Sequence, residues 1–224
     1  VDTKLFKERS LLSAISSAKN EMILPDEFEL NAGGDFAKMK IAKVYREYEA
    51  QMRANNALDF DDLLVKTVQL LQTQPDVLES YQERFRYITV DECQDTNTVQ
   101  FQLVSLLAEK YKNRCVVGDD DQSVYGFRGA KPGIMKDFMQ DYPEAKRILL
   151  DINYRSNAHI VKGALRVIGH NKDRYEKKIQ PFREAQETVH VQETLDPLDE
   201  SKYILKEILF SVIQVVIEYL LPIL

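Results

Sequence analysis

The sequence predicts an α/β fold in which a parallel sheet is flanked by helices and follows an N-terminal helical subdomain. Three short apolar runs support this prediction, because helical patterns separate them and each runs into acidic residues: Phe85–Val90, Cys115–Val117 and Ile148–Leu150. Buried strands that alternate with helices are typical of parallel sheets. The ligands of such sheets sit beyond the carboxyl ends of the strands.

Two helices are predicted before the first of these runs. From Asp35 to about Met52, apolar residues recur at helical spacing, and Asp35 is a suitable cap after two glycines. A second helix is expected to begin at Asp59, an acidic cap that precedes another apolar stripe. Pro75 is expected to mark the end of this second helix.

Helices are also predicted after the first and the third apolar run. Ser156 is the expected cap of the later helix, whose stripe begins at Ile160. The highly charged segment Lys172–Arg183 is expected to be a surface connection. The earlier helix carries its apolar stripe on Val99, Leu103, Leu106 and Leu107.

The last stretch of the chain is predicted to be an amphipathic helix. Gln214, Glu218 and Pro222 interrupt its apolar stripe, so packing against a core or a second subunit is favoured over a membrane anchor. Packing against a second subunit would be self-association through this helix, and packing against a core is the alternative. The stripe consists of Leu205, Ile208, Leu209, Val212, Val215, Val216, Tyr219 and Leu220.

The composition is that of an ordinary globular protein, with 224 residues of which 44% are hydrophobic. The formal charge of 30 − 36 = −6 argues against wholesale wrapping of nucleic acid but allows a local basic channel. Cys93 and Cys115 lie far apart without a CxxC spacing, so neither zinc nor a disulfide framework is indicated. Without a signal pattern or a long apolar run, a cytoplasmic protein with no membrane partner is expected.

Asp91 and Glu92 stand at the end of an apolar strand, a position that suits nucleotide hydrolysis. One carboxylate can hold Mg²⁺ through water, while its neighbour orients or deprotonates the attacking water. Alone, such a pair is more often a helix cap or a solvated surface. The motifs elsewhere in the chain decide between these alternatives.

Four segments carry these motifs: Ala57–Leu64 (ALDFDDLL), Val90–Asn97 (VDECQDTN), Gly118–Ala130 (GDDDQSVYGFRGA) and Asn153–Ser156 (NYRS). In this order they resemble motifs of the UvrD/Rep family of DNA helicases, and the resemblance covers roughly residues 35–185. It implies a partial RecA-like P-loop NTPase core. Residues 1–56 would be a helical subdomain inserted in the first core domain. Residues 57–145 would be part of that domain, and residues 146–224 the start of a second core domain plus the apolar C-terminal helix.

The resemblance implies a role for each residue of a nucleotide site that takes ATP and Mg²⁺. Asp91 and Glu92 would form the metal site, with Glu92 as the base for the attacking water, and Gln122 would sense the γ-phosphate. Tyr154 would lie against the adenine, and Arg155 would reach the γ-phosphate like an arginine finger. The alternatives are a loop-ordering amide for Gln122, and a structural ring with a surface ion pair for Tyr154 and Arg155.

Tyr125 and Phe127 flank a glycine and precede Arg128, a composition suited to stacking unpaired bases while a cation meets the backbone. Single-stranded DNA is the implied ligand. Many family members carry tryptophan where this chain has Phe127, so weaker stacking is expected. Alternatively both rings are core residues, although the neighbouring glycines and Arg128 argue against this. Gln122 and the two rings lie within six positions, so one loop would link the γ-phosphate to a DNA base.

No Gly-Lys dipeptide occurs in the chain, so the Gly-rich phosphate-binding loop of the family is expected upstream of Val1. The downstream family motifs are not recognisable after about residue 190. The chain is therefore expected to be an internal piece that by itself hydrolyses ATP poorly.

For the intact protein the resemblance implies an ATP-dependent helicase. It would step 3′ to 5′ along single-stranded DNA and separate strands at junctions of single- and double-stranded DNA, in the cytoplasm at the nucleoid. Two alternatives remain at this point. One is a non-catalytic module, derived from a helicase, that binds single-stranded nucleic acid or a partner. The other is a helicase-nuclease subunit that shares the same motor.

Overall fold

The computed structural model describes residues 6–131, 133–172, 174–185 and 188–215. The chain divides into two compact units, Val1–Ile148 with Asp173–Tyr175 and Leu149–Lys172 with Glu176–Leu224. The predicted division into three parts, with boundaries at residues 56 and 145, stays a prediction.

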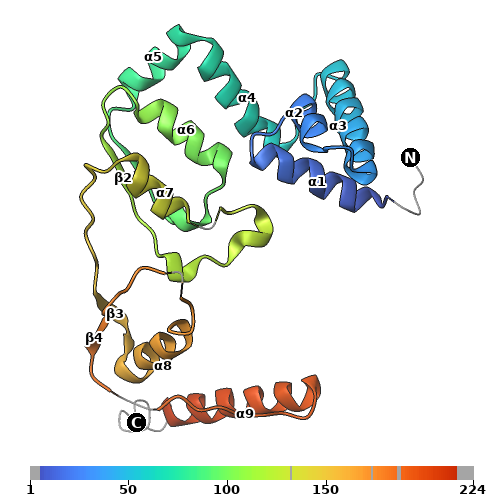
Figure 1. Cartoon of the computed structure of the whole chain (residues 1–224). Coiled ribbons are helices and arrows are strands. Elements are labelled where there is room, and N and C mark those ends of the chain that lie inside the picture. Colours follow the sequence, from blue (N-terminus) through green and yellow to red (C-terminus); the bar gives the residue numbers. More distant parts are fainter. Residues whose placement is uncertain (1–5, 132, 173, 186–187, 216–224) are drawn as a thin grey trace. The chain divides into compact units, whose positions relative to one another are not determined.

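Three helices form the N-terminal part of the first unit: α1 (Glu8–Asn20), α2 (Pro25–Asn31) and α3 (Phe36–Ala54) (Figure 1). Ile15, Ala18 and Tyr45 are buried at the centre of their shared core. The prediction of a helix that begins after Asp35 is confirmed by α3. The Asp35 carboxylate accepts hydrogen bonds from two backbone N–H groups of the first turn and so caps this helix.

The predicted helix after Asp59 is confirmed by α4 (Phe60–Thr73). Asp59 forms a capping box with Asp62, in which each side chain accepts a hydrogen bond from the backbone N–H of the other residue. Beyond the end of α4, Pro75 begins a further helix that was not predicted, α5 (Pro75–Arg84). Proline is favourable at a first helical position, because the N–H that it lacks has no partner there within the helix.

Two short parallel strands form the sheet of the first unit. Strand β1 (Ile88–Val90) pairs with β2 (Arg114–Val116), so that Val90 lies opposite Val116. Helix α6 (Thr98–Ala108) connects the strands, and α7 (Ile134–Asp141) follows β2 (Figure 1). The first two apolar runs are therefore confirmed to contain neighbouring strands of a parallel sheet. Both strands are short, and they are not buried as predicted, because Thr89 and Cys115 at their middle positions are exposed.

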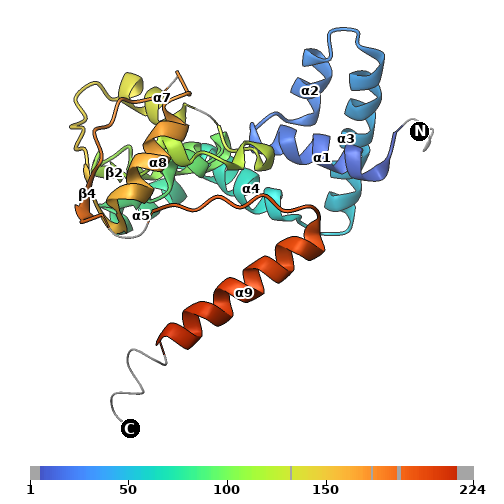
Figure 2. The same cartoon turned by 90° about the horizontal axis from the view of Figure 1, so that it is seen from below.

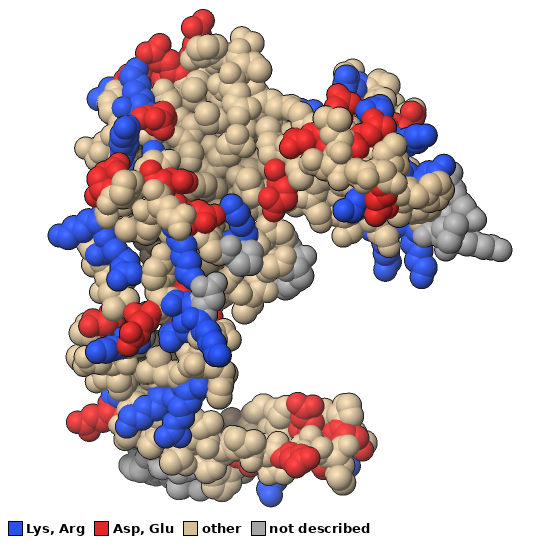
Figure 3. Space-filling model, viewed as in Figure 1, with Lys and Arg blue, Asp and Glu red and all other residues tan. Residues whose placement is uncertain are grey.

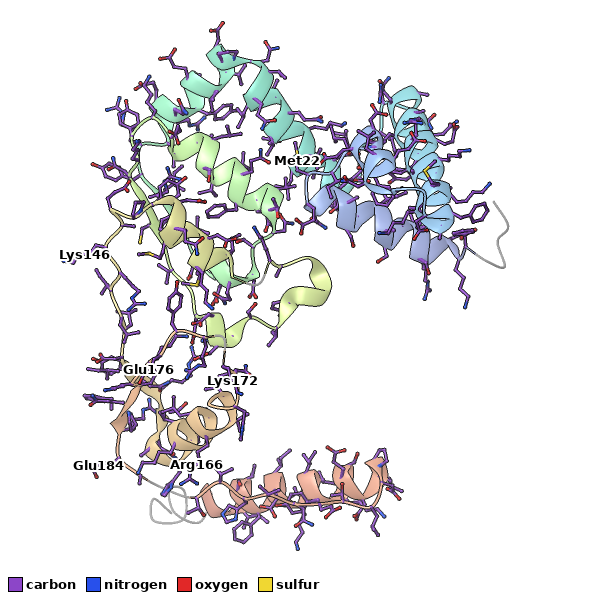
Figure 4. The ribbon with its side chains drawn as sticks, in the orientation of Figure 1. Met22, Lys146, Arg166, Lys172, Glu176 and Glu184 are labelled. Carbon is purple, nitrogen blue, oxygen red and sulfur yellow. The ribbon has the colours of Figure 1, made fainter. Side chains whose placement is uncertain are left out.

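The apolar centre beside this sheet lies between α4 and α6. Val65, Val68 and Val99 are buried there. Met22, from the turn after α1, packs against them (Figure 4). Burial of an aliphatic side chain contributes roughly 1.5–3 kcal/mol. Met22 therefore ties the N-terminal helices to the α4–α6 pair.

The second unit contains another pair of parallel strands, β3 (Ile152–Asn157) and β4 (Gln180–Arg183), together with α8 (Ala158–Ile168). The prediction of a buried strand at Ile148–Leu150 was wrong. These three residues lie outside any strand and their exposed fractions range from 49 to 79%. Pairing begins just beyond them, where the Gln180 N–H donates a hydrogen bond of 2.7 Å to the Asp151 carbonyl oxygen.

Two predictions around α8 also need correction. The cap of α8 is Asn157, whose side-chain oxygen accepts hydrogen bonds from the N–H groups of His159 and Ile160. Ser156, the predicted cap, is still part of the extended strand, and both residue types are good caps, so composition alone does not separate them. The segment Lys172–Arg183 is more than a surface connection, because its last four residues form β4.

The predicted amphipathic helix is confirmed up to Val215 by α9 (Pro197–Val215), which Figure 2 shows as one uninterrupted helix. The rest of the predicted stripe, residues 216–224, lies outside the described residues. Leu205, Ile208 and Leu209 are each more than half exposed. Uncharged surface extends along the helix in Figure 3. Among the described helices, none is long and apolar enough to cross a membrane.

Candidate functional site

Two acidic loops meet at the carboxyl edge of the β1–β2 sheet. The backbone N–H of Val117 donates a hydrogen bond of 2.7 Å to the carbonyl oxygen of Val90, which continues the strand pairing. The N–H of Cys93 then donates a bond of 2.9 Å to the carbonyl oxygen of Val117. The acidic pair after β1 is therefore held beside the loop Gly118–Gln122 after β2, as expected for parallel strands.

Glu92 has an unusual backbone conformation, with a φ of 51° in the left-handed region. Few residues other than glycine adopt this region, and it is often found at functional sites. Local hydrogen bonds hold Glu92 there. Its N–H donates to Asp91 Oδ1 at 2.9 Å, and its Oε2 accepts from Gln94 Nε2 at 2.7 Å. Asp91 and Glu92 are both exposed, so their carboxylates are available to a ligand.

Gln122 lies on the neighbouring loop, at the end of the short 3-10 helix η2 (Asp120–Gln122). Its side-chain nitrogen donates a hydrogen bond of 2.9 Å to Asp119 Oδ2. Asp119 also caps η2, because its Oδ1 accepts from the N–H of Asp121 at 3.1 Å. This contact fits the alternative in which Gln122 orders its loop, and the side chain is nevertheless exposed to solvent.

Gln94 joins these two loops, and the sequence interpretation missed this residue. Its side-chain nitrogen donates to Glu92, and its side-chain oxygen accepts a hydrogen bond of 3.0 Å from the N–H of Asp119. The residue is only 3% exposed. The position of Gln94, two residues after Glu92, was the one sequence feature that pointed to this role. Neither periodicity nor charge distinguishes Gln94 from a surface glutamine.

The predicted DNA-binding residues lie in the 3-10 helix η3 (Tyr125–Arg128), three residues beyond Gln122. The Tyr125 ring is 38% exposed, which favours a surface position over a core position. The side chains of Phe127 and Arg128 lie outside the described residues. Gly129 ends η3 with a φ of 86°, a left-handed conformation that glycine adopts without strain.

The sequence interpretation also missed the contacts that Arg174 and Tyr175 make with the loop Gly118–Gln122. Arg174 donates two hydrogen bonds, of 2.7 and 2.6 Å, to the two carboxylate oxygens of Asp121. The N–H of Tyr175 donates a bond of 2.7 Å to Asp120 Oδ2. Asp119, Asp120 and Asp121 cluster closely enough to suggest a cation site, but these contacts explain the cluster as a structural element.

Tyr154 and Arg155 belong to the second unit, on strand β3. The Tyr154 ring is 60% exposed and packs at 5.0 Å between centroids against the ring of Phe182 on β4. The Arg155 side chain is also exposed, while its N–H donates a hydrogen bond of 3.1 Å to Asn153 Oδ1. The structure thus brings Asp91, Glu92 and Gln122 together within the first unit and places Tyr154 beside Arg155 within the second.

The arrangement of two acidic loops at the carboxyl edge of a parallel sheet is that of α/β proteins that bind ligands at the ends of their strands. A sequence model of the UvrD/REP helicase N-terminal domain matches residues 1–143. The chain therefore belongs to the UvrD/REP helicase family. This membership confirms the predicted RecA-like α/β fold and the family resemblance of the motifs.

Similar proteins include the ATP-dependent DNA helicase PcrA of Staphylococcus epidermidis, which is 45% identical over 209 residues. The protein of the same name from Staphylococcus aureus is 44% identical over 209 residues. Each alignment covers 93% of this chain but 28% of the relative. The chain thus spans little more than a quarter of the length of these relatives.

Proposed function

We propose that this chain is part of the motor of an ATP-dependent DNA helicase, which couples ATP hydrolysis to stepping along single-stranded DNA. One observation supports the proposal above the others. The loop that carries Gln122 is tied to Glu92 through Gln94, and three residues later the same loop reaches Tyr125. A nucleotide site and a DNA contact on one short segment are what a stepping motor requires.

In this proposal, ATP binds with Mg²⁺ at the carboxyl edge of the β1–β2 sheet. Asp91 and Glu92 are the residues that would hold the ion, because exposed carboxylates at a strand end fit a hard divalent cation. The bound ion supplies positive charge next to the phosphates. Glu92 accepts the proton of the attacking water, and Gln122 meets the γ-phosphate.

In this proposal Tyr154 and Arg155 of the second unit also contact the nucleotide. The exposed ring of Tyr154 offers a face to adenine, and the tilted ring of Phe182 packs against it. The exposed guanidinium of Arg155 stabilises the charge that builds on the transferring phosphate. Both roles are consistent with the exposure of these side chains.

In the proposed DNA contact, Tyr125 and Phe127 stack on unpaired bases and Arg128 binds the DNA phosphates. Movement from 3′ to 5′, strand separation at junctions of single- and double-stranded DNA, and a cytoplasmic location at the nucleoid belong to the same proposal. The relatives named ATP-dependent DNA helicase PcrA support the ATP-dependent helicase activity in this proposal.

Binding of a labelled single-stranded oligonucleotide, followed by fluorescence anisotropy, tests the DNA contact in the 224-residue chain. The substitution Tyr125→Ala is expected to weaken binding by about 1–3 kcal/mol, because one stacked base is lost. The dependence of binding on salt concentration should stay unchanged, since the phosphate contacts remain.

The matched control is Tyr87→Ala, which removes an 83% exposed ring at the amino end of β1, the opposite edge of the same sheet. This control should bind the oligonucleotide as the unaltered chain does. Equal binding by Tyr125→Ala, or no binding by the unaltered chain, would contradict the DNA contact.

A further inference from the structure

Gln94 is a buried amide with a partner at each end. Its nitrogen lies 2.7 Å from Glu92 Oε2, and its oxygen lies 3.0 Å from the backbone nitrogen of Asp119. The carboxylate can only accept and the N–H can only donate, so a single orientation of the amide satisfies both neighbours. The two contacts therefore fix the amide between loops that are 25 residues apart.

Gly118 makes room for this amide. A Cβ atom at position 118 would lie 2.6 Å from the Gln94 side-chain oxygen and 3.2 Å from the backbone nitrogen of Cys93. An added Cβ would therefore displace the Gln94 amide, so glycine at this position lets the loop after β2 lie against Gln94. The first residue of the GDDDQ segment is thus explained by the position of Gln94.

The contacts form a continuous path from one loop to the other. Glu92 accepts from Gln94, Gln94 accepts from Asp119, and Asp119 accepts from the side chain of Gln122. A shift of the Gln122 loop would therefore pull on the Glu92 carboxylate. Glu92 is exposed and has a left-handed backbone. Within the described residues, the charge-assisted hydrogen bond from Gln94 restrains its side chain.

We propose that Gln94 is a positioning residue of the motor. It holds the Glu92 carboxylate in one orientation and links that orientation to the loop that carries Gln122. This inference rests on the proposed function, because it assigns Glu92 to the attacking water. A base acts efficiently only within hydrogen-bonding reach of its proton, so loss of this restraint should slow the chemical step more than it weakens ATP binding.

The first test is steady-state ATP hydrolysis stimulated by single-stranded DNA, in a protein that carries this chain together with a phosphate-binding loop. Gln94→Glu keeps the shape and the acceptor for Asp119 but removes the donor to Glu92. Gln94→Met removes both contacts. Each is expected to lower kcat by about 10- to 100-fold, the range for a misplaced catalytic group, while the KM for ATP changes less than about threefold.

The control for this test is Gln82→Met. Gln82 is also buried, and its side chain donates a hydrogen bond of 2.7 Å to the carbonyl oxygen of Leu106, away from the acidic loops. It should lower stability but leave kcat unchanged. Retention of kcat by Gln94→Glu in a protein with DNA-stimulated hydrolysis would overturn the inference and leave the proposed function standing. No DNA-stimulated hydrolysis by the unaltered protein would overturn both.

The second test uses the 224-residue chain and does not depend on activity. Amide hydrogen exchange at Asp119 should become about tenfold faster in Gln94→Met, which corresponds to the loss of one hydrogen bond. Gly118→Ala should accelerate the exchange as Gln94→Met does, whereas Gly163→Ala, at a position with no atom near the added Cβ, should not. Unchanged exchange in Gln94→Met would show that the two loops are not linked through this amide.

Discussion

At the scale of single residues, Lys19 is a buried cation at the junction of α1, α3 and α4, with 1% of its side chain exposed. Its ammonium lies 2.7 Å from Glu49 and 2.8 Å from each of Asp59 and Asp62. Burial lowers the pKa of Lys19, but the three carboxylates outweigh burial and raise this pKa above its ordinary value. Burial raises the pKa of the Asp59 carboxyl group. The hydrogen bonds from Lys19, the Asp62 N–H and Tyr48 outweigh burial and bring this pKa below its ordinary value.

Removal of this cation should destabilise the first unit strongly. We expect Lys19→Met to lower the free energy of unfolding at pH 7 by about 3–5 kcal/mol, because the carboxylates lose their buried partner. Urea unfolding followed by circular dichroism measures this loss. The matched control is Lys66→Met, because Lys66 is 42% exposed and lies 3.6 Å from Glu49. Lys66→Met should lower the free energy of unfolding by less than about 1 kcal/mol.

The same pair of proteins should respond differently to acid. The lowered pKa of Asp59 contributes stability that is present above pH 3.8 and is lost as the pH falls through the folded-state pKa. The raised pKa of Lys19 contributes stability that is present below pH 10.5 and is lost only in stronger base. The difference between the unaltered chain and Lys19→Met should therefore shrink from pH 5 to pH 3. A difference that stays constant over this range would contradict the account of the cluster.

At the scale of elements, the helices were predictable where an apolar stripe and a cap coincide. Helices α3 and α4 both begin directly after the aspartate that was predicted to cap them. Strand β3 was misplaced, because its sequence INYRSN contains mostly polar residues while the apolar run Ile148–Leu150 lies beside it. Pairing with β4, which lies more than 20 residues further along the chain, determines where this strand forms.

Helix α9 presents large apolar side chains that the described part of the second unit leaves exposed. Leu205, Ile208 and Leu209 share one stripe, and exposed stripes of this kind are typical of association surfaces. We expect the chain, whose mass is 26.0 kDa, to self-associate through this stripe. Leu205→Lys combined with Leu209→Lys should restore the monomer mass in light scattering after size-exclusion chromatography.

Glu207→Lys provides the control for this experiment, because it changes the charge of α9 outside the apolar stripe. That variant should keep the mass of the unaltered chain. A monomer mass for the unaltered chain at every concentration, or an unchanged mass for the double substitution, would contradict association through α9.

At the scale of the whole molecule, the candidate site was predictable as far as its parts lie in contiguous motifs. The acidic pair, Gln122 and the aromatic loop each follow a strand or lie a few residues beyond it, so strand order alone indicated that they share one edge. Gln94 and Arg174 could not be predicted in the same way. Gln94 contacts a residue 25 positions away in the sequence, and Arg174 contacts one 53 positions away. A local sequence pattern does not predict contacts over such separations.

The central claim is that Glu92 serves ATP hydrolysis that depends on single-stranded DNA. The most direct test compares ATP hydrolysis with and without a single-stranded oligonucleotide, in a protein that carries this chain together with a phosphate-binding loop. The account predicts that DNA stimulates hydrolysis and that Glu92→Gln lowers the stimulated kcat by about 100-fold or more, as expected for loss of a general base. ATP hydrolysis that single-stranded DNA does not stimulate, or an unchanged kcat in Glu92→Gln, would contradict this account.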